Sequence, residues 1–290
     1  MENRILREFI LKCIEEDVGD GDHSSLACIP ENATGKAKLL IKGSGILAGV
    51  RVAEEVFSVI DNQLITEVFI YDGNSISPGD IAFTVSGKQQ SILRSERLAL
   101  NILQRMSGIA TCTHEYVNMV KGFPVKILDT RKTGPGMRFL EKEAVRIGGG
   151  ENHRMGLYDM IMLKDNHIDY AGGIRSAIEK TQEYLKVKNK RLKIEIEARN
   201  LSDVKEILAC GGIDRIMLDN FSPEETKIAV EMIGGRFETE SSGGITLETI
   251  RSYAECGVDF ISVGALTHHI KSLDMSLKAA QLRQPSDPPV

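Results

Sequence analysis

The sequence predicts an α/β protein in which an N-terminal α+β sandwich layer precedes an incomplete α/β barrel of about six strands. Two observations predict this fold. Residues 36–87 contain short strands around one inserted helix, whereas strands and helices alternate strictly from residue 125 onward. Repeated strand–helix units specify a parallel sheet with right-handed crossovers. Each strand of the second part ends in charged residues or glycine, and only a barrel gives six strand ends one rim, so we favour a barrel over an open sheet.

The N-terminal layer is expected to span residues 1–110. Apolar residues at helical spacing from Ile5 to Ile14 predict a first helix that ends near Gly19. The further elements expected in this layer are strands at 36–42, 63–70 and 80–87, a helix at 50–60 and a long helix from residue 91.

The barrel is expected to span residues 111–267. Its strands are expected at 125–129, 159–163, 193–197, 214–219, 236–240 and 258–263. A final helix, at about 268–290, is expected to pack back on the N-terminal layer.

Composition excludes several classes of protein. The chain has 290 residues, a formal net charge of −5 and five scattered cysteines without zinc-ligand spacing, which is typical of a reducing cytosol. The N-terminus is amphipathic and unlike a signal peptide, and no apolar stretch approaches the roughly 20 residues of a membrane span. The sequence contains no tract of Lys and Arg that would favour binding of nucleic acid. We therefore expect a soluble, cytoplasmic protein without nucleic-acid or membrane partners.

Cations gather after the first barrel strand and on both sides of the second. Arg131, His153, Arg154 and Lys164 lie in glycine-bearing segments there, and guanidinium groups bind carboxylates or phosphates through paired hydrogen bonds. A lone arginine is usually a solvated surface residue and a lone histidine a core residue, but the clustering favours a clamp. The expected ligand is a multiply charged anion.

Glycines end the last two barrel strands. Ser242 and Gly243 lie in ETESSGGI, and Gly264 lies in ISVGALTH. Backbone N–H groups in such loops hold phosphate in many barrels. The alternative is that these glycines only make tight turns. Two such loops on neighbouring strands favour phosphate.

Two carboxylates end neighbouring strands. Glu197 and Asp219 are costly to bury unless they meet a cation or hydrogen-bond donors. They suit Mg²⁺ or ribose hydroxyls, although salt bridges to Lys132 or Lys164 are the alternative. Glu195, two residues earlier on the same strand, is a weaker candidate.

Other motifs are absent. The sequence has no GxSxG elbow, no phosphate-binding GxxxxGK[ST] and no strand before GGG at 148–150. A Schiff-base aldolase is disfavoured because Lys132 lies beside Arg131 without an apolar lining.

Arg97 lies on a polar stripe of the long helix, which without a partner would be an ordinary helix face.

The motifs together resemble a known family. DTRKTGPGMRFLEKEAVRIGGGENHRMGLYDMIMLKDNH, with SERLALN before it and ESSGGIT and DFISVGALTH after it, is similar to quinolinate phosphoribosyltransferase, also called nicotinate-nucleotide pyrophosphorylase (carboxylating). The resemblance covers residues 16–280. It implies transfer of phosphoribose from phosphoribosyl pyrophosphate to quinolinate, with loss of CO2, to give nicotinate mononucleotide for NAD synthesis. It also implies the fold of type II phosphoribosyltransferases and a homodimer or higher homo-oligomer.

The resemblance also implies roles for the site residues. Arg131, His153 and Arg154, with Arg97 from a neighbouring subunit, match the clamp on the two quinolinate carboxylates. The other matches are Lys132 and Lys164 for pyrophosphate and substrate, Glu197 and Asp219 for ribose and Mg²⁺, and Ser242, Gly243 and Gly264 for the 5′-phosphate.

The sequence departs from the family pattern at a few positions. ARN follows Glu197 where an acidic residue is common, Gly134 replaces a usual threonine, and His269 replaces a serine after LTH. Two rivals stay open. One is a related phosphoribosyltransferase for a different acid, associated with molybdate transport. The other is a non-catalytic phosphosugar-binding protein.

Overall fold

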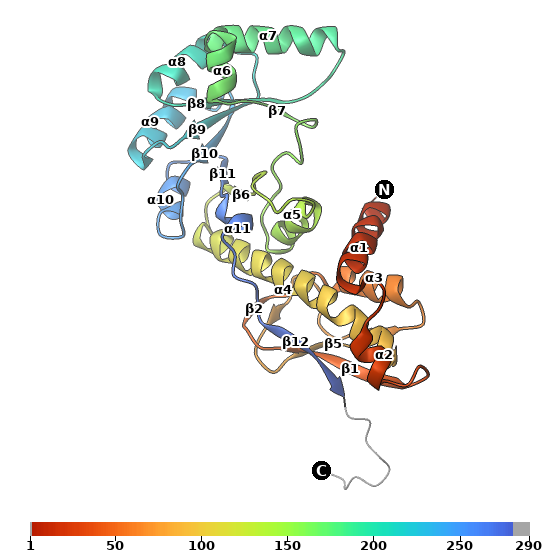
Figure 1. Ribbon diagram of the computed structural model, residues 1–290. Coiled ribbons are helices and arrows are strands. Elements are labelled where there is room, and N and C mark those ends of the chain that lie inside the picture. Colours follow the sequence, from red (N-terminus) through yellow and green to blue (C-terminus); the bar gives the residue numbers. More distant parts are fainter. Residues whose placement is uncertain (1, 281–290) are drawn as a thin grey trace. The chain divides into compact units, whose positions relative to one another are not determined.

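The computed structural model describes residues 2–280, and the chain divides into two compact units (Figure 1). One unit comprises Met1–Cys112 together with Ile270–Val290, and the other comprises Thr113–His269. Within residues 2–280, every helix is too short or too polar to cross a lipid bilayer.

The first unit contains a four-stranded antiparallel sheet in the order β12-β1-β5-β3. Its strands are β1 (Thr34–Ile41), β3 (Ile65–Val68), β5 (Ile81–Lys88) and β12 (Met275–Ala280), and β2 (Gly45–Ile46) pairs with β4 (Ser75–Ile76). Its helices are α1 (Glu2–Val18), α2 (His23–Cys28), α3 (Val50–Ile60) and α4 (Gln89–Met119), the last of which continues into the second unit. Alternate residues of β1, Ala37, Leu39 and Ile41, are buried, as expected for a strand with one face on a core.

The C-terminal segment corrects one prediction. We expected a helix at about 268–290, but the segment forms the strand β12, which pairs antiparallel with β1 from Met275 opposite Ile41 to Ala280 opposite Lys36. Met275 and Leu277 are buried at alternate positions, so the period of two, completed by a free edge of β1, outweighs helical propensity. The rest of the expected helix, residues 281–290, lies outside the described residues.

The second unit contains a six-stranded, wholly parallel sheet in the order β6-β11-β10-β9-β8-β7. Its strands are β6 (Lys126–Leu128), β7 (Ile161–Leu163), β8 (Ile194–Ala198), β9 (Arg215–Asp219), β10 (Glu238–Ser242) and β11 (Phe260–Ser262). The order is the cyclic order of a barrel opened between β6 and β7, so the predicted incomplete barrel is confirmed.

Helices connect the barrel strands and lie along the outer side of the sheet (Figure 1). They are α5 (Arg138–Ile147), α6 (Asp165–Ala171), α7 (Ile174–Val187), α8 (Leu201–Cys210), α9 (Pro223–Ile233), α10 (Ile250–Ala254) and α11 (Ala265–His268). Ile194, Ile196 and Ala198 of β8 belong to the apolar core that α6, α7, α8 and α9 share with the sheet. Successive residues of a strand face opposite sides, so Glu195 and Glu197 face the barrel interior.

Candidate active site

The carboxyl ends of the barrel strands line one cavity of about 720 Å³ within the second unit. Its walls include most of the residues singled out from the sequence: Arg131, Lys132, His153, Arg154, Lys164, Asp219, Ser242, Gly243 and Gly264. Segments more than a hundred residues apart in the chain therefore bring their charges to a single mouth, the usual location of chemistry in α/β barrels.

Glu197 and Lys164 form an ion pair at the rim. Lys164 Nζ lies 3.2 Å from Glu197 Oε1, and the peptide N–H of Asp165 donates to Glu197 Oε2 at 2.9 Å. Burial and the negative charge of Glu197 raise the pKa of Asp219. The salt-bridge alternative is thus correct in part for Glu197, while Asp219 keeps a charge that a cation can neutralise.

The glycine loops lie close to neighbouring atoms. Gly243 has φ +98°, and a Cβ there would lie 2.2 Å from Asn220 Oδ1. A Cβ on Gly264 would lie 2.9 Å from His268 Nε2 and 3.1 Å from Lys132 Cδ. Glycine at these positions therefore keeps bare backbone at the cavity wall, where an anion can reach it.

The cationic loop after β6 is anchored to the helix α11. Thr267 Oγ1 donates to the carbonyl oxygen of Lys132 at 2.8 Å. Burial lowers the pKa of the Arg154 guanidinium, and the charge of Arg131 lowers it further. Because the two positive charges repel each other, an anion that binds between them is stabilised.

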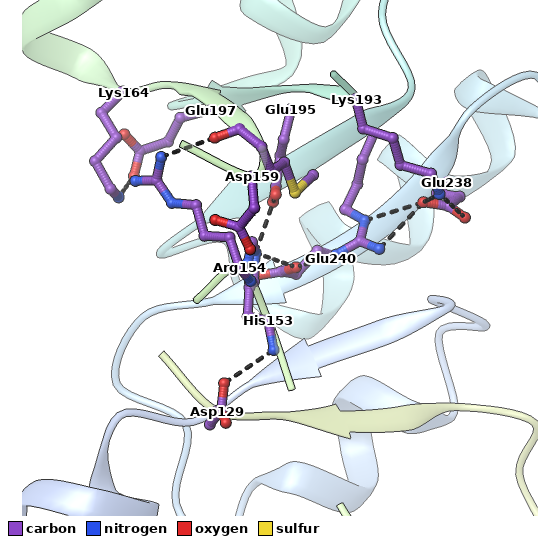
Figure 2. A network of polar contacts seen from close by, with 12 residues as sticks. Asp129, His153, Arg154, Asp159, Lys164, Lys193, Glu195, Glu197, Glu238 and Glu240 are labelled. Carbon is purple, nitrogen blue, oxygen red and sulfur yellow. Dashed lines mark hydrogen bonds and ion pairs between the residues drawn. The ribbon is translucent and has the colours of Figure 1, made fainter. Parts of the chain in front are cut away.

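His153 is the most enclosed member of the group, at 8 % exposed. Its Nε2 lies 3.0 Å from Glu195 Oε2 and 3.3 Å from Glu240 Oε2. Figure 2 shows His153 with these two carboxylates. Burial lowers the pKa of His153, but the two carboxylates outweigh it and raise the pKa to about 9. The peptide N–H of Arg154 points at Nδ1 at 2.6 Å, and an imidazolium must give up this contact. Because two buried carboxylates outweigh one backbone hydrogen bond, we assign the imidazolium at neutral pH.

A charged interior beneath the cavity was not predicted from the sequence. Arg215 on β9 donates to Glu240 Oε2 at 2.9 Å and to Glu238 Oε2 at 3.1 Å, and it stacks on Phe260 with 3.8 Å from Cζ to the ring centroid. Alternating charges in RIMLD and ETESS are the signal that could have revealed it. His153, Glu195 and Glu240 also lie close enough to share a metal ion, but Arg215 already supplies positive charge to Glu240.

Arg97 lies on α4 in the first unit and its side chain is exposed. It shares an exposed helix face with Arg94 and Asn101, as the spacing predicts. It is not among the residues that line the cavity.

Two family models match consecutive parts of the chain. The quinolinate phosphoribosyl transferase N-terminal domain matches residues 22–107, and the C-terminal domain of the same family matches residues 109–278. The chain belongs to the quinolinate phosphoribosyltransferase family. Its two units largely correspond in sequence to the two domains that define this family, although the C-terminal model also matches residues 270–278, which belong to the first unit.

Relatives in the family come from plants and bacteria. The chain is 47% identical over 288 residues to the chloroplastic nicotinate-nucleotide pyrophosphorylase [carboxylating] of Arabidopsis thaliana, covering 94% of this chain and 82% of the relative. It is 40% identical over 274 residues to a probable nicotinate-nucleotide pyrophosphorylase [carboxylating] of Bacillus subtilis, covering 94% and 92%.

Solved structures share the fold. The crystal structure of NadC from Streptococcus pyogenes has a TM-score of 0.89 at 39% identity, covering 93% of this chain and 94% of that one. The nicotinate-nucleotide pyrophosphorylase from Francisella tularensis has a TM-score of 0.89 at 37% identity, covering 96% and 97%.

Proposed function

We propose that this chain transfers phosphoribose from phosphoribosyl pyrophosphate to quinolinate and releases pyrophosphate and CO2, so that nicotinate mononucleotide is formed for NAD synthesis. Membership of the family carries the assignment of the reaction. The observation that supports it at the site is one cavity that combines a cationic loop, the carboxylate of Asp219 and two bare-backbone loops, with Glu197 paired to Lys164 of its wall.

The diacid is assigned to the cationic part of the cavity. Arg131, His153 and Arg154 line one part of the cavity, and the carboxylate of Glu195 lies 3.0 Å from His153 Nε2. Quinolinate carries two adjacent carboxylates, and each charge-assisted hydrogen bond to such a group contributes roughly 1.5 to 3 kcal/mol. A monocarboxylic acid leaves one of these cations unmatched, so the clamp favours a diacid.

The phosphorylated sugar is assigned to the remaining walls. Ser242, Gly243 and Gly264 hold the 5′-phosphate through hydroxyl and backbone donors, and Lys132 and Lys164 face pyrophosphate. Glu197 and Asp219 lie near the carboxyl ends of the neighbouring strands β8 and β9 and offer the hard oxygen ligands that Mg²⁺ prefers. The raised pKa of Asp219 is relieved by a cation, so these residues fit Mg²⁺, which when bound neutralises phosphate charge.

The charges of the cavity suit both steps of the reaction. As the pyridine nitrogen attacks C1 of the ribose, the bond to pyrophosphate breaks and its electron pair leaves with the pyrophosphate. Positive charge on the sugar then faces the rim carboxylates, and negative charge on the leaving group faces the lysines. In the second step the 2-carboxylate leaves as CO2, and the electron pair stays on C2 beside the positive ring nitrogen until C2 takes a proton from water. Neither step requires a general base.

Assembly and location are part of the same proposal. We expect a homodimer or larger assembly in which Arg97 of one subunit completes the clamp of its neighbour, because Arg97 matches the arginine with this role in the family and its side chain is exposed. A cytoplasmic location stays a prediction, since relatives include chloroplastic and mitochondrial proteins.

The activity is tested with purified protein, quinolinate, phosphoribosyl pyrophosphate and Mg²⁺, with nicotinate mononucleotide measured by chromatography. We expect product with quinolinate and none with nicotinate or another monocarboxylic acid. No product from quinolinate, with turnover of a different acid, would favour the molybdate-associated rival. Ligand binding that neither needs Mg²⁺ nor leads to product would favour a phosphosugar-binding protein.

A further inference from the structure

A buried ion pair lies behind the cationic loops. Lys142 on α5 and Asp129 at the end of β6 are both 0 % exposed, and Lys142 Nζ donates to Asp129 Oδ1. Such a pair can often be replaced by apolar residues without loss of stability, so stability alone does not account for its location beside the site.

The pair holds the main chain of His153 on both sides. The peptide N–H of His153 donates to Asp129 Oδ1 at 2.9 Å, a contact drawn in Figure 2. Lys142 Nζ donates to the carbonyl oxygen of His153 at 3.0 Å. The Asn152 amide, oriented with its nitrogen toward Asp129, donates to Oδ2 at 2.7 Å. Both peptide groups of His153 are therefore fixed by charged side chains.

The ring of His153 is held separately. Its Nε2 lies against Glu195 of β8 and Glu240 of β10, so main-chain and side-chain anchors come from different elements. The Lys142 contact to the His153 carbonyl also fixes the peptide plane that leads into Arg154. On the same helix, Arg138 Nη1 donates to the carbonyl oxygen of Met155 at 3.0 Å, which ties the next residue down as well.

We propose that Lys142 and Asp129 are positioning residues for the diacid: they fix the backbone at His153 and Arg154 so that both side chains face the substrate carboxylates. The inference rests on the proposed role of His153 and Arg154 as the clamp. A preorganised clamp binds more tightly because its ordering is complete before the ligand arrives. Apart from Lys132, the residues assigned to phosphoribosyl pyrophosphate lie on other segments of the chain, so its binding should depend little on this pair.

The test compares Lys142→Met, which keeps the length of the side chain, with the double variant Lys142→Met/Asp129→Asn, which leaves no unpaired buried charge. The matched control is Lys126→Met, since Lys126 on β6 forms an exposed pair with Glu151 at 2.9 Å. Steady-state kinetics give kcat and the KM of each substrate. Calorimetry gives the affinity for benzene-1,2-dicarboxylate, which has the two carboxylates and cannot react. Circular dichroism and thermal unfolding check the fold.

We expect Lys142→Met and the double variant to raise the KM of quinolinate and the Kd of benzene-1,2-dicarboxylate by about ten- to a hundredfold, the loss of one charge-assisted hydrogen bond. The KM of phosphoribosyl pyrophosphate should stay within about twofold. A folded double variant with an unchanged KM for quinolinate overturns the inference. So does failure of both variants to fold, or a rise of both KM values together, because these outcomes indicate a purely structural pair.

A second comparison separates this inference from the proposed function. His153→Ala and Arg154→Ala should weaken binding of the dicarboxylate. If they do not, the assignment of the clamp itself is wrong. If they do and the Lys142 variants do not, only the positioning role is wrong.

Discussion

Nε2 of His153 lies 3.0 Å from Oε2 of Glu195, and both side chains are buried inside the barrel. The contact joins the wall of the cavity to a charged layer beneath it, which also contains Glu240 and Arg215. The histidine ring is thus held by buried acidic side chains before any substrate arrives. An imidazolium held in this way is a permanent partner for a carboxylate.

His153 makes stability depend on pH. Its folded pKa of about 9 lies above the ordinary 6.5, so its stabilisation is complete below pH 6.5 and is lost as the pH rises through 9. Arg154 is beside it in sequence, and Glu195, Glu240 and Arg215 belong to the charged layer that it meets. The free energy of unfolding in urea should fall by about 3 kcal/mol over this range, since one pKa unit corresponds to about 1.4 kcal/mol. Burial also raises the pKa of Glu195 to about 7. Its contribution to the free energy of unfolding is therefore also lost as the pH rises, but at lower pH than that of His153.

The comparison that checks this prediction uses His153→Gln and, as a control, His114→Gln, where the histidine is exposed. The His153 variant should lose less stability between pH 6.5 and 9 than the unmodified protein, and the His114 variant should follow the unmodified protein. Parallel curves for all three proteins would mean that His153 has an ordinary pKa.

Gly243 should tolerate no side chain, whereas its neighbour Gly244 offers a matched control. Both have positive φ, +98° and +62°, but a Cβ on Gly244 meets nothing within 4 Å, whereas one on Gly243 meets Asn220 Oδ1 at 2.2 Å. Alanine at either position should cost about 1 kcal/mol of backbone strain, and Gly243→Ala a further 1 to 3 kcal/mol, approximately, from the clash. Only Gly243→Ala should raise the KM of phosphoribosyl pyrophosphate. Equal KM values in the two variants would argue against a phosphate loop there.

Asp219→Asn tests the rim carboxylates. We expect kcat to fall by about 10² or more, as when one preorganised charge is removed from a developing transition state. The Mg²⁺ concentration for half-maximal rate should rise. Asp169→Asn is the control, because Asp169 is an exposed carboxylate on α6 paired with Arg199. An unchanged Mg²⁺ requirement in Asp219→Asn would place the cation elsewhere.

Arg97→Ala and Lys132→Ala proteins, each inactive alone, should regain activity when mixed. If subunits exchange at random into dimers, about half are mixed and each contains one intact site, so about a quarter of full activity returns. Lys132→Ala mixed with Asp219→Ala is the control, because both residues line the same barrel cavity and every mixed dimer keeps a defect in each site. Recovery in both mixtures, or in neither despite demonstrated exchange, would contradict a shared site.

The main features of the fold could be predicted because short apolar runs followed by glycine and charge identify parallel strands with little ambiguity. The strands found at Ile194–Ala198 and Arg215–Asp219 lie within a residue of those expected at 193–197 and 214–219. The rim residues followed from the same rule, since all carboxyl ends of a parallel sheet share one edge. The helix predicted for the final segment was wrong because it was judged from local sequence alone. The strand with which β12 pairs lies more than 230 residues earlier, so local patterns do not reveal the pairing.

The buried charges inside the barrel could not be predicted from the sequence. Arg215 and Glu240 appear in the sequence as ordinary polar positions, and only strand register brings them into contact. Lys142 lies in a helix whose sequence, RFLEKEAVRI, resembles a solvated surface helix, yet it is fully buried. A buried lysine is recognised by its partners, Asp129 and the His153 carbonyl, and these become neighbours only in the folded barrel.

The most direct test of the account measures CO2 released from quinolinate labelled at the 2-carboxylate, together with nicotinate mononucleotide from the same reaction. If one cavity joins the diacid to the sugar before the carboxylate leaves, release of one CO2 per nucleotide is expected, and none without phosphoribosyl pyrophosphate. Labelled CO2 released in the absence of phosphoribosyl pyrophosphate, or nucleotide formed without it, would contradict the account.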